Sequence, residues 1–267
     1  MSVSFEKLGQ LGRMGNQLFQ IAAVVSVAAD NNLEARLPAW KYMDLFVGED
    51  WPVTIREVTE HHIDNRLYVH SKIQTTAHLN LQGLFQHNDY TKNCEARLRR
   101  MLAFRPDLVA DTVSKVRRCL PAYPDCIAVH VRRTDYLSKE FAFLNVCTLE
   151  YYQHAIDILR ERTGCDVLVV SDDYDWCREN FPGAIMSPGM DEREDFCILS
   201  QAKNKVISNS TFAWWATWLN PGGEVIAPAP WTRRNEAEGM YLPGWQKIRT
   251  RHVQNRRPRM FGSLFGL

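Results

Sequence analysis

The second half of the chain alternates between short apolar runs and amphipathic segments. The apolar runs favour β-strands and cover residues 126–131, 166–171, 205–208 and 224–227. Between and after them, apolar residues recur at helical spacing over residues 149–162, 174–180, 191–203 and 211–219. Strands that alternate with helices of this length form a parallel sheet with helices on both faces. The pattern therefore predicts an α/β fold for this half.

The first half has a less regular pattern. Its elements are expected to be strands at 4–8, 67–70 and 79–85 and helices at 16–30, 91–103 and 107–119. The first of these helices follows a turn with three glycines, and Asn16 is a suitable N-cap for it. Pro121 and Pro124 then interrupt the pattern. We therefore predict two α/β halves, residues 1–120 and 121–267.

Charged side chains follow the strand expected at 126–131. The cluster consists of His130, Arg132, Arg133 and Asp135. Ligands of open α/β sheets bind at the carboxyl ends of strands, and the planar guanidinium of arginine matches phosphate oxygens. By the two-residue period of a strand, His130 and Arg132 face one side and Arg133 the other. Arg133 is expected to pair with Asp135 or to support the loop. The alternative for the whole cluster is a salt bridge without a ligand.

Two further segments have groups suited to an anionic ligand. One is the glycine turn at residues 12–17, and the other is the start of the helix at 211–219, with Ser210 and Thr211. Free backbone N–H groups and the helix dipole attract anions at such positions. Ordinary helix entry and capping are the alternative for both. The three tryptophans of the second helix, at helical spacing, are expected to be structural.

In this order, the three segments resemble those of the α-1,2-fucosyltransferases, glycosyltransferase family 11. They read Gly-Arg-Met-Gly-Asn-Gln, His-Val-Arg-Arg-Thr-Asp and Ser-Asn-Ser-Thr-Phe-Ala-Trp-Trp. The first two also resemble segments of the α-1,6- and protein O-fucosyltransferases. Residues 81–86 are similar to the family's Gly-Tyr-x-Gln segment, and the resemblance extends from about residue 8 to about residue 231. It implies a GT-B-like fold, with two Rossmann-like halves facing each other across a cleft.

The resemblance also implies a reaction. L-Fucose would pass, with inversion, from GDP-β-L-fucose to O-2 of a terminal galactose on a glycan acceptor. The residues expected to bind the donor are Gly15, Asn16, Gln17, His130, Arg132, Asn209, Ser210, Thr211 and Phe212. Arg132 would stabilise the charge that builds on the β-phosphate as GDP departs. We expect neither a cofactor nor a metal ion.

The carboxylates after the strand at 166–171 allow two interpretations. Asp172 can accept hydrogen bonds from the N1–H and 2-amino groups of guanine. Asp173 and Asp175 have instead the Asp-x-Asp spacing with which metal-dependent glycosyltransferases hold an ion on a diphosphate. We favour the first because arginine already neutralises the phosphates, which leaves a metal ion no task. Asp173 is also suited to cap the following helix.

The general base is a separate question. The acceptor hydroxyl loses its proton during transfer, and a carboxylate in the loop is the expected base. Glu140 follows Asp135 by five residues, the spacing at which α-1,6-fucosyltransferases place a catalytic glutamate. Asp135 is the second candidate. An ion pair of Glu140 with Lys139, without any catalytic role, is the alternative.

Composition and charge narrow the range of partners. A formal net charge of +1 gives no general attraction to nucleic acid. Seven cysteines without a C-x-x-C pair predict neither a zinc site nor a disulfide set. No secretion signal or bilayer-spanning stretch is visible, so we expect a cytoplasmic protein. Five arginines at 249–259, followed by apolar residues, are suited to peripheral contact with an anionic membrane. A non-catalytic binding protein with this basic tail is the alternative function.

Overall fold

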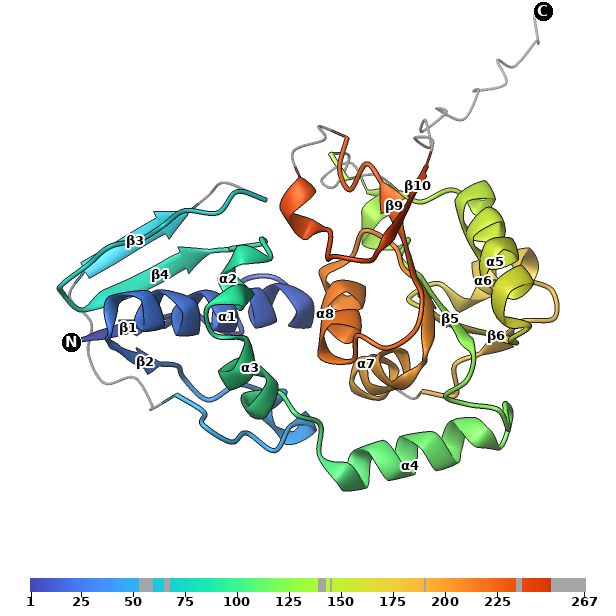
Figure 1. Cartoon of the computed structure of the whole chain (residues 1–267), viewed down its shortest axis with the longest axis horizontal. Helices are drawn as coiled ribbons and strands as arrows, with labels where there is room; N and C mark the ends of the chain where they lie inside the picture. The colour runs from blue at the N-terminus through green and yellow to red at the C-terminus, as the bar shows by residue number, and fades with distance from the viewer. Residues whose placement is uncertain are drawn as a thin grey trace, which may run out of the picture.

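The structure contains two parallel β-sheets, each covered by helices (Figure 1). It is a computed structural model that describes residues 1–52, 60–64, 68–138, 143–144, 146–189, 191–233 and 237–250. Glu140 and the tail from residue 251 onward lie outside the described residues, so the predictions for them stay predictions. No helix within the described ranges has the length and apolarity that crossing a bilayer requires.

The first sheet is built from the N-terminal strands in the order β2-β1-β4-β3. These strands are β1 (Ser2–Ser4), β2 (Glu34–Arg36), β3 (Glu60–Asp64) and β4 (Leu79–Gly83). Helix α1 (Met14–Asn31) packs against β1 and β2. Its residues are buried along most of its length, because the first sheet, α2 (Asp89–Lys92) and α8 (Thr211–Leu219) of the second half all pack against it.

The second sheet has six parallel strands in the order β10-β9-β8-β5-β6-β7. They are β5 (Ile127–Val131), β6 (Val167–Ser171), β7 (Ile185–Met186), β8 (Asn204–Val206), β9 (Val225–Ala229) and β10 (Gln246–Arg249). The helices between them are α5 (Leu149–Thr163), α6 (Tyr174–Asn180), α7 (Glu192–Gln201) and α8 (Thr211–Leu219). The direction of strand addition reverses between β5 and β8. In such sheets the crevice outside this point binds the ligand.

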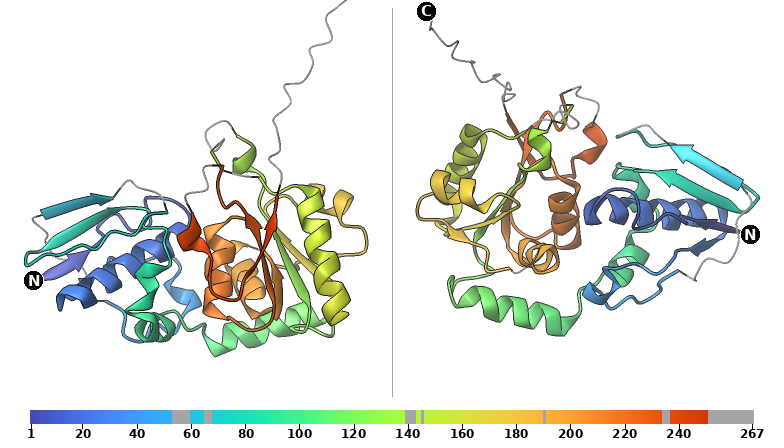
Figure 2. Two further views of the ribbon diagram at one scale, coloured as in Figure 1. Left: turned by 45° about the horizontal axis from the view of Figure 1, so that its top comes forward. Right: turned by 180° about the vertical axis from the view of Figure 1, so that it is seen from behind.

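Three helices connect the two sheets. They are α2 (Asp89–Lys92), α3 (Glu95–Met101) and α4 (Pro106–Arg117). Helix α4 contacts α7 of the second half, and the predicted boundary at residue 120 follows its end. Short 3₁₀ helices are η1 (Met43–Leu45), η2 (Asp135–Leu137) and η3 (Glu238–Met240). The two halves are thus joined by a connection that packs rather than by an extended linker (Figure 2).

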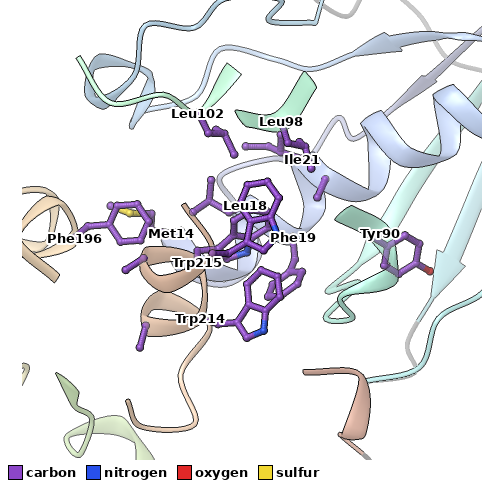
Figure 3. Close-up of a cluster of buried hydrophobic side chains, with 14 of the residues drawn as sticks. Met14, Leu18, Phe19, Ile21, Tyr90, Leu98, Leu102, Phe196, Trp214 and Trp215 are labelled. Carbon is purple, nitrogen blue, oxygen red and sulfur yellow. The ribbon is translucent and has the colours of Figure 1, made fainter. Parts of the chain in front are cut away.

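Aromatic packing joins the two halves through α1 and α8 (Figure 3). The Phe19 ring lies 4.6 Å from the Trp214 ring and 5.1 Å from the Trp215 ring, measured between centroids. Both tryptophans are completely buried, which confirms the prediction that they are structural. A side chain at Gly15 would overlap the backbone of Thr211 and Phe212. Glycine at this position therefore lets the start of α1 approach the start of α8.

Most elements predicted for the second half are confirmed, and several in the first half are not. Helices α6 and α8 have the predicted bounds. The strand expected at 4–8 lies instead at Ser2–Ser4, and the N-cap of α1 is Arg13 rather than Asn16. Strands β2, β3, β7 and β10 were missed. β2, β7 and β10 have two to four residues, too few to show a period.

Candidate active site

A cavity of about 380 Å³ lies between the two halves, at the carboxyl ends of β5 and β6 and the start of α8. Ten of the residues predicted to form the site line it: Gly15, Asn16, His130, Arg132, Asp135, Asp172, Asn209, Ser210, Thr211 and Phe212. Glu140, the remaining candidate base, lies outside the described residues. The chain therefore brings together residues from four segments that are far apart in the sequence.

Two carboxylates hold the guanidinium of Arg132. Its Nη2 donates to Asp135 Oδ2 at 2.6 Å, and its Nη1 lies 3.2 Å from Asp172 Oδ2. Burial by itself lowers the pKa of this arginine, but Asp172 and Asp135 outweigh that effect and raise the pKa. The charge is thus retained in a side chain that is only 11% exposed. A cation held in one orientation beside a cavity is suited to stabilise an anion there.

Arg133 points away from the cavity, as the strand period predicted. The expected pair with Asp135 is wrong, however, because Arg133 Nε lies 3.2 Å from Asp173 Oδ2. Its guanidinium also stacks 3.9 Å from the centroid of the Trp176 ring. Asp135 pairs with Arg132 instead. Helix η2 begins at Asp135, and the Asp135 side chain points back toward the cavity. Arg133 therefore fixes the loop after β5.

The carboxylates of the metal-binding interpretation do not line the cavity. Asp173 pairs with Arg133 and caps α6 by accepting from the backbone N–H of Trp176. Asp175 is almost fully exposed and pairs with Arg178 at 2.8 Å. Among the described residues, no three His, Cys, Asp or Glu side chains gather in a way that would hold a metal ion. The Asp-x-Asp spacing here belongs to a helix start.

His130 is a buried, neutral side chain. Its Nδ1 lies 2.8 Å from Ser208 Oγ, and its ring stacks on Phe212 with 5.4 Å between centroids. Burial, together with the nearby charges of Arg132 and Arg13, lowers the pKa of His130 to about 3. The imidazole therefore carries no charge near neutral pH. It can contribute a hydrogen bond to a ligand but not a positive charge.

The positive end of α8 faces the cavity. Ser210 caps the helix, since its side chain accepts from the backbone N–H of Phe212 at 3.3 Å. Thr211 Oγ1 donates to Asn16 Oδ1 at 3.0 Å, which ties the helix start to α1. The helix dipole and the N–H groups that have no partner within the helix favour negative charge at this place. Arg132 and the start of α8 thus act on the same cavity.

Gln17 was predicted to line the cleft but does not. Its Nε2 donates to the carbonyl of Gly12 at 2.8 Å, and its Oε1 accepts from Trp40 Nε1 at 2.7 Å. The side chain is buried and holds the glycine turn in place. Asn16, one residue earlier, faces the cavity because successive helix residues point about 100° apart. The motif therefore contains one lining side chain and one supporting side chain.

The structure adds lining residues that the sequence did not single out. They include Arg13, Gln86, Glu192 and Asp195. Arg13 belongs to the glycine turn and lies 3.6 Å from Glu192 across the cleft, between Nη2 and Oε2. Gln86 lies in residues 81–86, which are similar to the family's Gly-Tyr-x-Gln segment, and this similarity could have identified it. Asp195 stands inside an amphipathic helix, and nothing in the local sequence distinguishes it from a surface residue.

Asp195 is a buried carboxylate with two neutral donors. Its Oδ1 accepts from Ser187 Oγ at 2.6 Å, and its Oδ2 accepts from the Tyr174 hydroxyl at 3.1 Å. Burial raises the pKa of this aspartate, although both hydrogen bonds oppose the shift. Each oxygen keeps a further lone pair. Asp195 can therefore accept hydrogen bonds from a ligand in the cavity.

Comparison with known proteins decides the family. The model of glycosyl transferase family 11 matches residues 8–249. The chain belongs to this family. An α-1,2-colitosyltransferase from Escherichia coli is 35% identical over 170 residues, which are 58% of this chain and 56% of that protein. A galactoside α-(1,2)-fucosyltransferase 1 from Alouatta belzebul is 28% identical over 89% of this chain and 73% of its own.

Solved structures agree with the fold of this family 11 protein. A structure of the α-1,6-fucosyltransferase NodZ from Bradyrhizobium, soaked with GDP-fucose, aligns with a TM-score of 0.54 and 13% identity. The alignment covers 85% of this chain and 94% of that chain. The GT-B-like α/β fold expected from the sequence is confirmed. The chain spans only 56% and 43% of the lengths of the first two curated relatives, both from Escherichia coli.

Proposed function

We propose that this protein transfers L-fucose from GDP-β-L-fucose to O-2 of a terminal galactose on a glycan acceptor, with inversion. The observation that carries the proposal is the convergence of Arg132 and the start of α8 on one cavity of a family 11 fold. Fucose and the α-1,2 linkage are supported by the name of the relative that matches 89% of this chain. The diphosphate would lie between Arg132 and the N–H groups of α8.

The departure of GDP creates negative charge on the β-phosphate while the sugar becomes positively charged. Arg132 would stabilise the phosphate charge in the transition state more than in the ground state, which is the condition for acceleration. Arg13 would add a second cation from the opposite half. Because arginine and the helix supply the positive field, the reaction would need no metal ion.

The test is a set of incubations with several nucleotide sugars and β-galactosides in the presence of EDTA. We expect transfer only from GDP-fucose, to O-2 of galactose, with full activity in the chelator. Mass spectrometry identifies the products, and NMR gives their linkage and anomeric configuration. An absolute need for manganese or magnesium, or transfer from a uridine nucleotide instead, would contradict the proposal.

Asp195 is our first candidate for the recognition of guanine, and Asp172 is the second. Asp172, favoured by the sequence, accepts from the backbone N–H of Arg133 at 2.9 Å, accepts from the Thr134 hydroxyl and pairs with Arg132. Its oxygens are thus engaged in holding the loop after β5. The two neutral donors of Asp195 leave its charge available for the N1–H and 2-amino groups of guanine.

Asp195→Asn should weaken GDP binding by about tenfold or more and reduce the preference for GDP over UDP, since the amide brings a donor to a guanine donor. The ionised carboxylate is the accepting form, and its pKa is raised. GDP affinity of the unmodified protein should therefore fall as the pH drops through this raised pKa, and the variant should lack that dependence. Calorimetry at several pH values measures both effects.

Asp172→Asn is the matched variant for this prediction. We expect it to lower activity through the loss of the Arg132 contact while the preference for GDP over UDP persists. If Asp172→Asn abolishes the preference and Asp195→Asn retains it, the two assignments must be exchanged.

Asp135 is proposed as the base that removes the acceptor proton. Its Oδ2 holds Arg132, while its Oδ1 is buried and has no hydrogen-bond partner among the described residues. This oxygen belongs to the carboxylate that holds Arg132, so an acceptor hydroxyl bound to it would lie close to the reacting sugar. Glu140 is the second candidate.

Asp135→Asn should lower kcat by roughly 10²- to 10⁴-fold, the range for a missing general base, with GDP affinity unchanged. Steady-state kinetics and calorimetry give the two quantities, and Glu140→Gln is made in parallel. A large loss of kcat in Glu140→Gln alone would move the role of base to Glu140. Loss of folding in Asp135→Asn would identify Asp135 as structural.

A further inference from the structure

The turn after β4 carries Gln86 into the cavity. Phe85 adopts a left-handed backbone conformation with φ of +51°, which residues other than glycine rarely adopt. Its ring packs in the core, 6.3 Å from Phe5 and 5.6 Å from Tyr90. Packing of Phe85 therefore maintains a strained turn, and the result is that the next side chain lines the cavity.

The orientation of the Gln86 amide is set by its neighbours. Asn16 Oδ1 accepts from Thr211 Oγ1 at 3.0 Å and from Gln86 Nε2 at 2.6 Å. In this arrangement the oxygen of Asn16 is the common acceptor, and the NH₂ group of Gln86 faces it. The carbonyl oxygen Oε1 of Gln86 is then directed elsewhere.

This carbonyl oxygen has no partner among the described residues. Gln86 is only 5% exposed but lines the cavity, so a ligand bound there is the partner within reach of this oxygen. A buried carbonyl without a hydrogen bond is unfavourable, and a ligand that donates to it recovers the loss. A hydroxyl group of the ligand is the donor that such a site fits.

We propose that Gln86 accepts a hydrogen bond from a ring hydroxyl of the transferred sugar and so determines which donor sugar is used. This inference rests on the proposed function. Gln86 is linked through Asn16 to Thr211 at the start of α8, where the diphosphate is proposed to bind. The sugar is bonded directly to the β-phosphate, so it is the part of the substrate next to the start of α8.

The experiment compares GDP-fucose with its 2-deoxy, 3-deoxy and 4-deoxy analogues as donors. In the unmodified protein, kcat/KM should fall about 10- to 100-fold for one of the three analogues. This analogue lacks the hydroxyl group that donates to Gln86, so the buried carbonyl stays unpaired. In Gln86→Met, which keeps the length of the side chain but removes the acceptor, that ratio should approach one. Gln74→Met is the control, because Gln74 is exposed and outside the cavity lining.

The outcomes separate a failure of the role of Gln86 from a failure of the proposed function. Unchanged ratios for all three analogues in Gln86→Met overturn the role of Gln86. Equal use of all four donors by the unmodified protein overturns it as well, whether or not the variant folds. If the unmodified protein binds GDP but transfers from none of the four donors, the proposed function fails instead. Calorimetry with GDP monitors the folding of the variant.

Discussion

Arg132→Lys should remove most of the transfer activity while the protein stays folded. Lysine keeps the charge but cannot contact Asp135, Asp172 and a phosphate with one planar group, whereas the guanidinium of Arg132 already pairs with both carboxylates. Loss of a preorganised contact to the leaving phosphate should cost about 3 kcal/mol of transition-state stabilisation, or roughly 10²-fold in kcat. Single-turnover kinetics at saturating donor gives this value.

Arg133→Lys is the control for this prediction, because the two arginines are neighbours and only one of them lines the cavity. Arg133 stacks on Trp176 and pairs with Asp173, so its replacement should lower the melting temperature slightly and leave kcat within a few-fold of normal. Equal losses of kcat in the two variants would mean that Arg132 acts by maintaining the loop and not by contact with the donor.

Gly15→Ala should disrupt both stability and donor binding. In a helix interior alanine is favoured over glycine by about 1 kcal/mol. Here the added methyl group would overlap the backbone at Thr211 and Phe212 and force the start of α8 away from α1. Overpacking of this kind typically costs 1–3 kcal/mol, and no flexible side-chain end can yield to relieve it. We expect a lower melting temperature and a GDP affinity reduced by about tenfold or more.

Gly222→Ala is the matched control, since the added methyl group there would meet only Asn220 Oδ1 at 3.8 Å, an ordinary contact. Thermal unfolding and calorimetry with GDP are measured for both variants. If Gly15→Ala binds GDP as the unmodified protein does, the close contact between α1 and α8 has no part in forming the donor site.

The sequence alone predicted four of the six strands of the second sheet, the helices between them and the positions of the charged groups. Buried parallel strands are continuous apolar runs, and in the helices between them apolar residues recur every three to four positions. Both patterns can therefore be recognised in a short stretch of sequence. This is why the bounds of α6 and α8 were predicted correctly. The strand period also separated Arg132 from Arg133, because neighbouring side chains of a strand must point to opposite faces.

Which of these groups meet depends on how distant segments pack. Asp172 reaches Arg132 because β5 and β6 are adjacent and in register, with Val131 beside Ser171. Asp195 and Gln86 enter the cavity because the first turn of α7 and the turn after β4 lie there. A local pattern shows the face on which a side chain lies but not the partner across the space, since that depends on how distant segments pack. The chemistry of the site was therefore visible in the sequence, and its pairings were not.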